Sequence, residues 1–270
     1  MIERLLNREV VVEEHNQAAF NGSIVVVLAY SMAIVGAEVL GVFGAVGLGA
    51  LCQALLIPVL LSHYALAEKS SYRRMLPALA LLPLLRLLSL TLPIREAPQL
   101  DWYAIIGLPL LLAAVLTIRL LALPWWTGLS LRWPAAGGQI AIAVSGLPLG
   151  LAAFLILRPQ PLIVRFNWPA IILAAVSLMV FSALVEELIF RSIIQEVAIE
   201  ALGPRIGLLY SSGLFAVMYI GSLSLGYVLF IGSVGFLFGW CVRRTGLIWG
   251  VVLAHSLLII GLLLIWPFII

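Results

Sequence analysis

The sequence has little charge. Lys, Arg, Asp and Glu together make up 10% of its 270 residues, whereas hydrophobic residues make up 64%, and the mean hydropathy is +1.19. Soluble domains are about 25% charged, so the composition excludes a soluble globular protein. The chain also lacks the strand-length alternation of polar and apolar residues that outer-membrane barrels show. The composition therefore predicts a helical membrane protein with several spans.

Cysteine and clustered basic charge are scarce as well. Cys52 and Cys241 lie in or beside apolar runs, so the sequence predicts neither a disulfide framework nor a cysteine zinc site. The net charge of +3 comes from residues scattered at the ends of apolar runs, and no basic stripe exists. We therefore expect no nucleic-acid partner. Residues 1–18 carry charges of both signs, unlike a cleavable signal peptide, and we expect an uncleaved first span.

Apolar runs of membrane-spanning length follow one another along the chain. A helix needs about 20 residues to cross the hydrocarbon core of a bilayer. The expected fold is an all-α, polytopic transmembrane bundle of eight or nine helices in a lipid bilayer. The expected spans lie near residues 20–40, 43–66, 74–93, 102–123, 139–157, 168–190, 204–220, 224–242 and 246–269.

The placement of Lys and Arg predicts the orientation, because cytoplasmic connections carry an excess of both. An N-terminus in the cytoplasm places most basic residues inside and few outside. The inner residues would be Arg4, Arg8, Lys69, Arg73, Arg74, Arg132, Arg191, Arg205, Arg243 and Arg244, and the outer ones Arg95, Arg158 and Arg165. We expect a multi-pass protein of the plasma or inner membrane with a cytoplasmic N-terminus.

The charged residues within the expected spans divide the chain into two parts. Residues 1–165, the predicted N-terminal accessory helices, carry Glu38, Arg86 and Arg119 within spans. We interpret these three as packing groups, either paired, as Glu38 with Arg86, or reaching the membrane interface. Residues 166–270, the predicted functional bundle, carry a denser group of ionisable side chains.

Two adjacent glutamates and an arginine interrupt the apolar run that begins near Trp168. An ionisable group at bilayer depth costs about 2.5–3.5 kcal/mol on insertion scales, so it marks a site. On a helix, Glu187 and Arg191 are four residues apart with the glutamate first, which is the favourable order for an ion pair. Glu186 lies about 100° around the axis. We predict a structural pair of Glu187 with Arg191, and a Glu186 that faces a cavity.

The motif Glu-Glu-x-x-x-Arg at residues 186–191 resembles that of the CPBP intramembrane proteases, which include the CAAX prenyl endopeptidases and abortive-infection proteins. Members of this family also carry Phe-x-x-x-His on a second helix and His-x-x-x-Asn on a last one. Residues 244–249, which lead into His255, are similar to the family's last helix. The resemblance covers about residues 165–265.

Two positions depart from the family's pattern. Tyr219 ends the second motif, which begins at Phe215, where the family has histidine. Ile259 ends the third motif, which begins at His255, where the family has asparagine. No Asn or Asp follows Asn167, so no neighbouring residue supplies the missing amide.

The resemblance implies an intramembrane endopeptidase that acts on a membrane-associated protein or peptide. Glu186 would be the general base, His255 a metal ligand or oxyanion donor, and Tyr219 an auxiliary donor. Glu187 and Arg191 would support these groups. Zinc is the implied cofactor, with His255 and Glu186 as its ligands, but a catalytic zinc ion usually takes three protein ligands.

Two functions stay open at this point. The first is the endopeptidase, with activity weakened or altered by the two departures. The second is a catalytically inactive pseudoprotease that serves as a membrane scaffold, binding partner or assembly factor, or as a component of a larger membrane complex. A transporter is disfavoured, because the sequence shows no inverted repeat with broken helices.

Overall fold

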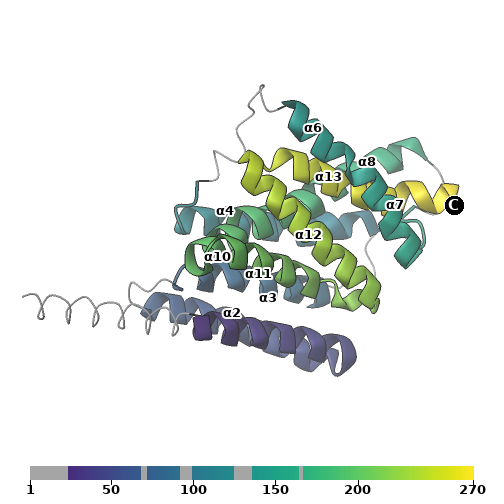
Figure 1. Ribbon diagram of the computed structural model, residues 1–270. Helices are drawn as coiled ribbons and strands as arrows, with labels where there is room; N and C mark the ends of the chain where they lie inside the picture. The colour runs from purple at the N-terminus through teal and green to yellow at the C-terminus, as the bar shows by residue number, and fades with distance from the viewer. Residues whose placement is uncertain (1–23, 68–71, 92–98, 125–135, 164–166) are drawn as a thin grey trace, which may run out of the picture.

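The computed structural model describes residues 24–67, 72–91, 99–124, 136–163 and 167–270. Within these ranges the regular structure is helical throughout, and nine helices result when contiguous segments are joined (Figure 1). This confirms the predicted all-α polytopic bundle. Five of them belong to the N-terminal part, namely Ile24–Phe43, α2 (Val46–Leu66), α3 (Met75–Thr91), α4 (Gln99–Leu120), and the joined segments α6 (Ala136–Val144) and α7 (Gly146–Leu157).

The C-terminal part contains four helices, two of which include π-helical segments. Its elements are α8 (Trp168–Leu178), η3 (Met179–Leu184), α9 (Val185–Glu187), η4 (Leu188–Ile194), α10 (Gln195–Leu202), α11 (Pro204–Val217), η5 (Ile220–Ser222), α12 (Leu225–Thr245), α13 (Trp249–Ile260), η6 (Gly261–Ile265) and α14 (Trp266–Ile269). The segments η3, η4 and η6 are π-helical, and η5 is a 3₁₀ turn.

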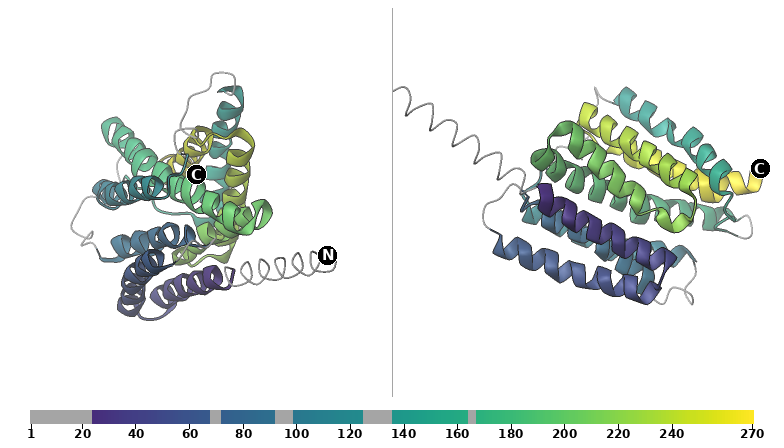
Figure 2. Two further views of the ribbon diagram at one scale, coloured as in Figure 1. Left: turned by 90° about the vertical axis from the view of Figure 1, so that its left-hand side faces the viewer. Right: turned by 60° about the horizontal axis from the view of Figure 1, so that its bottom comes forward.

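Seven helices in the described part of the chain are long and apolar enough to cross a membrane. The protein is therefore an integral multi-pass membrane protein, as predicted. The shorter helix α3 is buried over its first half, from Met75 to Leu82, so it lies inside the bundle. The long helices run back and forth along one direction, and the C-terminus lies at the opposite end from the start of Ile24–Phe43 (Figures 1 and 2).

The side of the membrane on which the N-terminus lies stays a prediction. Several residues on which that prediction depends lie outside the described ranges, namely residues 1–18, Lys69, Arg95, Arg132 and Arg165.

The helix that carries the two glutamates is longer than expected. The predicted span ended near residue 190, but the helix continues through η4 and α10 to Leu202. The predicted end is wrong because the charges that suggested it are paired inside the bundle. The helix ends at Gly203, whose φ of 82° glycine tolerates, and Pro204 begins the next helix. The π segments η3 and η4 flank the glutamates, and such segments are frequent at functional sites.

The two parts of the chain pack against each other as one body. Helix α4 contacts η3, α9 and η4, while α6 and α7 contact α13. The contact of α7 with α13 depends on a glycine, since a Cβ on Gly146 would lie 2.1 Å from the carbonyl oxygen of Ala254. The predicted division into accessory and functional helices is a statement about roles, and it stays a prediction.

The close contact of α7 with α13 predicts a large effect of a single methyl group. Gly146→Ala should destabilise the protein by about 1–3 kcal/mol, because overpacking pushes the helices apart. Gly213→Ala is the matched control, since a Cβ at that position meets nothing within 4 Å. Alanine also has a higher helix propensity than glycine, so this variant should not lose stability. The measurement is the folded fraction of each purified variant after heating in detergent. Equal heat resistance of the two variants would contradict the packing.

Candidate functional site

Three ionisable side chains form a buried network between α13 and the helix Trp168–Leu202, which carries both glutamates and is called the glutamate helix below. Glu187, on α9, and Arg191, on η4, are 0% exposed, and His255, on α13, is 3% exposed. Arg191 Nε donates to Glu187 Oε2 at 3.0 Å, which confirms the predicted pair. His255 Nδ1 lies 2.8 Å from Glu187 Oε1. Because a carboxylate only accepts, Nδ1 carries the proton in this hydrogen bond.

Aromatic rings enclose this network. The guanidinium carbon of Arg191 lies 5.0 Å from the centre of the Phe215 ring, and the His255 ring meets Phe215 edge-on at 6.0 Å. The centre of the Phe238 ring, on α12, lies 6.2 Å from that of His255. Neither Nη group of Arg191 has a hydrogen-bond partner among the described residues. The cation–π contact with the Phe215 ring therefore stabilises this end of the guanidinium in place of hydrogen bonds.

Glu186 has a separate set of partners. Ser182 Oγ donates to Glu186 Oε1 at 3.1 Å, and the Tyr219 hydroxyl donates to Glu186 Oε2 at 2.7 Å. Ser182 lies one helical turn earlier, and Tyr219 follows the end of α11. Neither bond involves Arg191, as the helical spacing predicted. Both oxygens of Glu186 are therefore held by hydroxyl groups and not by a cation.

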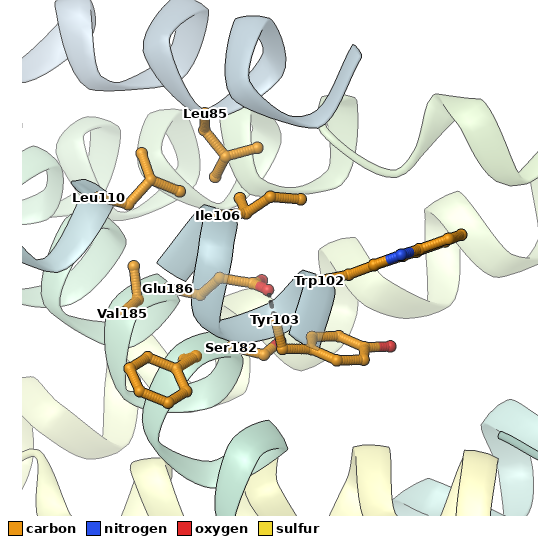
Figure 3. Close-up of a pocket in the computed structure, with 9 residues that line it drawn as sticks. Leu85, Trp102, Tyr103, Ile106, Leu110, Ser182, Val185 and Glu186 are labelled. Carbon is orange, nitrogen blue, oxygen red and sulfur yellow. Dashed lines mark hydrogen bonds between the residues drawn. The ribbon is translucent and has the colours of Figure 1, made fainter. Parts of the chain in front are cut away.

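Glu186 also lines a pocket of about 240 Å³ between α3, α4 and the glutamate helix (Figure 3). Its carboxylate reaches toward the side chains of α4. The other lining residues are mostly apolar, and the full set is Leu85, Trp102, Tyr103, Ile106, Leu110, Phe181, Ser182, Val185 and Glu186. This arrangement confirms that Glu186 faces a cavity.

The structure brings two of the three predicted catalytic residues into direct contact. Tyr219 bonds to Glu186, whereas the Nδ1 of His255 bonds to Glu187. Successive side chains on a helix diverge by about 100°, so Glu187 faces α13 while Glu186 faces α4 and the end of α11. Ile259, one turn beyond His255, is 9% exposed and adds no polar group.

Sequence reasoning missed much of the pocket. Ser182 is four residues before Glu186, and this spacing is a usable signal for a contact on one helix face. The α4 residues Trp102, Tyr103 and Ile106 belong to the part interpreted as accessory, and their apolar composition gave no sign of a role. No group of three His, Cys, Asp or Glu side chains placed to hold a metal ion occurs among the described residues. The zinc expectation stays a prediction.

The fold and the network define a class: a multi-pass helical membrane protein with an intramembrane Glu-Glu-x-x-x-Arg motif. Residues 166–260 match the family of type II CAAX prenyl endopeptidase Rce1-like proteins. This match supports the resemblance to the CPBP/CAAX proteases that the sequence predicted for this part of the chain. Searches of curated proteins and of solved structures gave no match.

The buried network predicts a large cost for removing its cation. Arg191→Met should destabilise the protein by about 3–5 kcal/mol, because it leaves the Glu187 carboxylate buried without its cation. Arg119→Met is the matched control, since Arg119 is exposed on α4. Thermal unfolding in detergent measures both. If Arg191→Met loses no more thermal stability than Arg119→Met, the Glu187–Arg191 pair contributes little to the stability of the fold.

Proposed function

We propose that the protein is an intramembrane endopeptidase of the CAAX-protease type in which Glu186 is the general base. The observation that supports this is the position of Glu186, a carboxylate outside the Arg191 ion pair at the wall of an apolar pocket. The family suggests protein substrates. The proposed substrate is therefore a membrane-associated protein or peptide segment, whose apolar side chain would enter between α3 and α4.

The proposed reaction is hydrolysis of a peptide bond by an activated water molecule. Glu186 takes a proton from water, and the water oxygen attacks the carbonyl carbon and forms a new C–O bond. When the tetrahedral intermediate breaks its C–N bond, the proton on Glu186 passes to the leaving nitrogen. The Ser182 and Tyr219 hydroxyls hold the carboxylate in place before the reaction. Apolar walls strengthen these contacts by excluding bulk water.

The donor set beside Glu186 does not fit a catalytic zinc ion. Such an ion takes three protein ligands, and the predicted ligands were Glu186 and His255 alone. Tyr219 stands where the family's second motif has histidine, and its hydroxyl is bonded to Glu186. Ile259 stands where the third motif has asparagine, and it supplies no donor. We therefore propose no step through zinc.

A pseudoprotease is the second candidate, and one observation favours it. Both oxygens of Glu186 already accept hydrogen bonds from protein hydroxyls, so a water molecule must compete for the base. In that case the bundle would serve as a scaffold or assembly factor for another membrane protein. The Glu186 variant below separates the two functions.

Glu186→Gln should abolish the formation of specific new protein termini in the membrane fraction, because an amide cannot take the proton. The expected loss in rate is about 10²–10⁴-fold. The measurement maps termini by mass spectrometry in cells that carry the native chain or the variant at equal levels. The matched control is Glu196→Gln, the same change at an exposed position of the same helix. Identical maps for native protein and Glu186→Gln would contradict the protease and direct attention to binding partners.

Filling the pocket should also block the reaction while leaving the fold intact. Ile106→Trp introduces an indole into the space beside Glu186, and we expect Glu186-dependent termini to fall about tenfold or more, because misplacing a substrate slightly costs much rate. Leu108→Trp, on the exposed face of α4, is the control. If both variants form termini at the native rate, the pocket is not the substrate's binding place.

A further inference from the structure

We propose that Arg86, in the N-terminal part, is a positioning residue that holds the Tyr219 hydroxyl against Glu186. The contact runs from α3 to the turn that follows α11, so it joins the two parts of the chain at the site. Its consequence for catalysis rests on the proposed function. The contact itself is a matter of geometry, and it is testable without any substrate.

A buried ion pair fixes the Arg86 guanidinium. Its Nε donates to Glu38 Oε2 at 2.6 Å, and its Nη2 lies within ion-pair distance of Glu38 Oε1. The Glu38 side chain is 1% exposed and that of Arg86 is 17% exposed. A two-point contact fixes the direction of the planar guanidinium as well as its position. The Glu38–Arg86 pair, predicted from sequence as a packing contact, thus orients the guanidinium for a third contact.

The third contact reaches the backbone beside Tyr219. Arg86 Nη2 donates to the carbonyl oxygen of Met218 at 2.7 Å. Helix α11 ends at Val217, and the last carbonyl groups of a helix need partners from outside it. A guanidinium also suits this position, since the C-terminal end of a helix attracts positive charge. Arg86 therefore stabilises the place at which α11 ends.

Tyr219 is the next residue, and its hydroxyl depends on that turn. Its backbone has φ −102° and ψ 8°, outside the helical range, so the turn sets the direction of the side chain. The ring packs edge-on against Phe215 at 5.3 Å and Tyr227 at 5.9 Å, and the hydroxyl reaches Glu186 at 2.7 Å. Hydrogen bonds weaken steeply with distance and angle, so a displaced turn loses this bond.

The residue before Arg86 supports the same role for α3. Leu85 lines the pocket beside Glu186, while Arg86 holds Met218. Two consecutive residues of α3 thus contact the site from different sides.

The test measures how fast dicyclohexylcarbodiimide, an apolar reagent, labels Glu186 in the purified full chain. The reagent adds to a carboxyl oxygen, and the Tyr219 hydroxyl covers one of the two oxygens of Glu186. Tyr219→Phe should speed labelling about tenfold, the size of effect that one hydrogen bond to a charged group brings. Arg86→Met should speed it to a similar extent. Fragmentation of the labelled peptide distinguishes Glu186 from Glu187.

The double variant separates positioning from general loosening. If Arg86 acts through Tyr219, Arg86→Met added to Tyr219→Phe gives no further increase, because contacts in one chain of interactions are not additive. Independent effects would multiply and would overturn the inference. Arg74→Met is the matched control, since Arg74 pairs with Glu200 and donates to the carbonyl of Leu121 at 2.6 Å. It should label at the native rate.

A second variant covers the case in which Arg86→Met does not fold. Glu38→Gln with Arg86→Gln removes both buried charges, and the shorter side chain at position 86 cannot reach both the amide at position 38 and the Met218 carbonyl. It should also label faster than the native protein, and native-rate labelling by this folded variant would overturn the inference. Faster labelling without any Glu186-dependent termini would support the positioning role of Arg86 and contradict the protease. Glu186-dependent termini together with labelling at the native rate would support the protease and contradict the positioning role of Arg86.

Discussion

The Glu187 carboxylate is the group on which the structure of the site depends. Its two oxygens join Arg191 on its own helix to His255 on α13. Unpaired buried charges cost several kcal/mol each, so this network permits a charged motif in the middle of an apolar helix. It allows the helix to continue to Leu202, and it fixes α13 against the motif. Because adjacent side chains diverge, pairing Glu187 in this way leaves Glu186 to face the pocket.

The surroundings of Glu186 come from both parts of the chain. The glutamate helix supplies Ser182, α4 supplies the aromatic wall, and the turn after α11 supplies Tyr219. The N-terminal helices, predicted as accessory, thus build half of the pocket. The Glu38–Arg86 pair extends this dependence to the backbone at Met218. A family match confined to residues 166–260 therefore describes the motif better than it describes the site.

The features that sequence predicts well are those set by local spacing. Apolar run lengths gave the bundle, and the separation of four residues gave the Glu187–Arg191 pair. Which of the two adjacent carboxylates bonds to His255 depends on how the glutamate helix is rotated about its axis relative to α13. The π segments η3 and η4 change that rotation, and composition does not reveal them. The α4 wall was missed because apolar side chains that line a pocket look like those that face lipid.

The most direct measurement compares the thermal unfolding of Glu186→Gln and Glu187→Gln in the same detergent. The two variants make the same change at adjacent positions. Glu187→Gln should lower the unfolding temperature by about 5 °C or more, because Arg191 then lacks its counter-ion. Glu186→Gln should lie close to the native protein, since its partners are hydroxyl groups that also bond to an amide. If both variants lower the unfolding temperature equally, or if Glu186→Gln lowers it more, the account of Glu187 as the structural carboxylate and Glu186 as the functional one is contradicted.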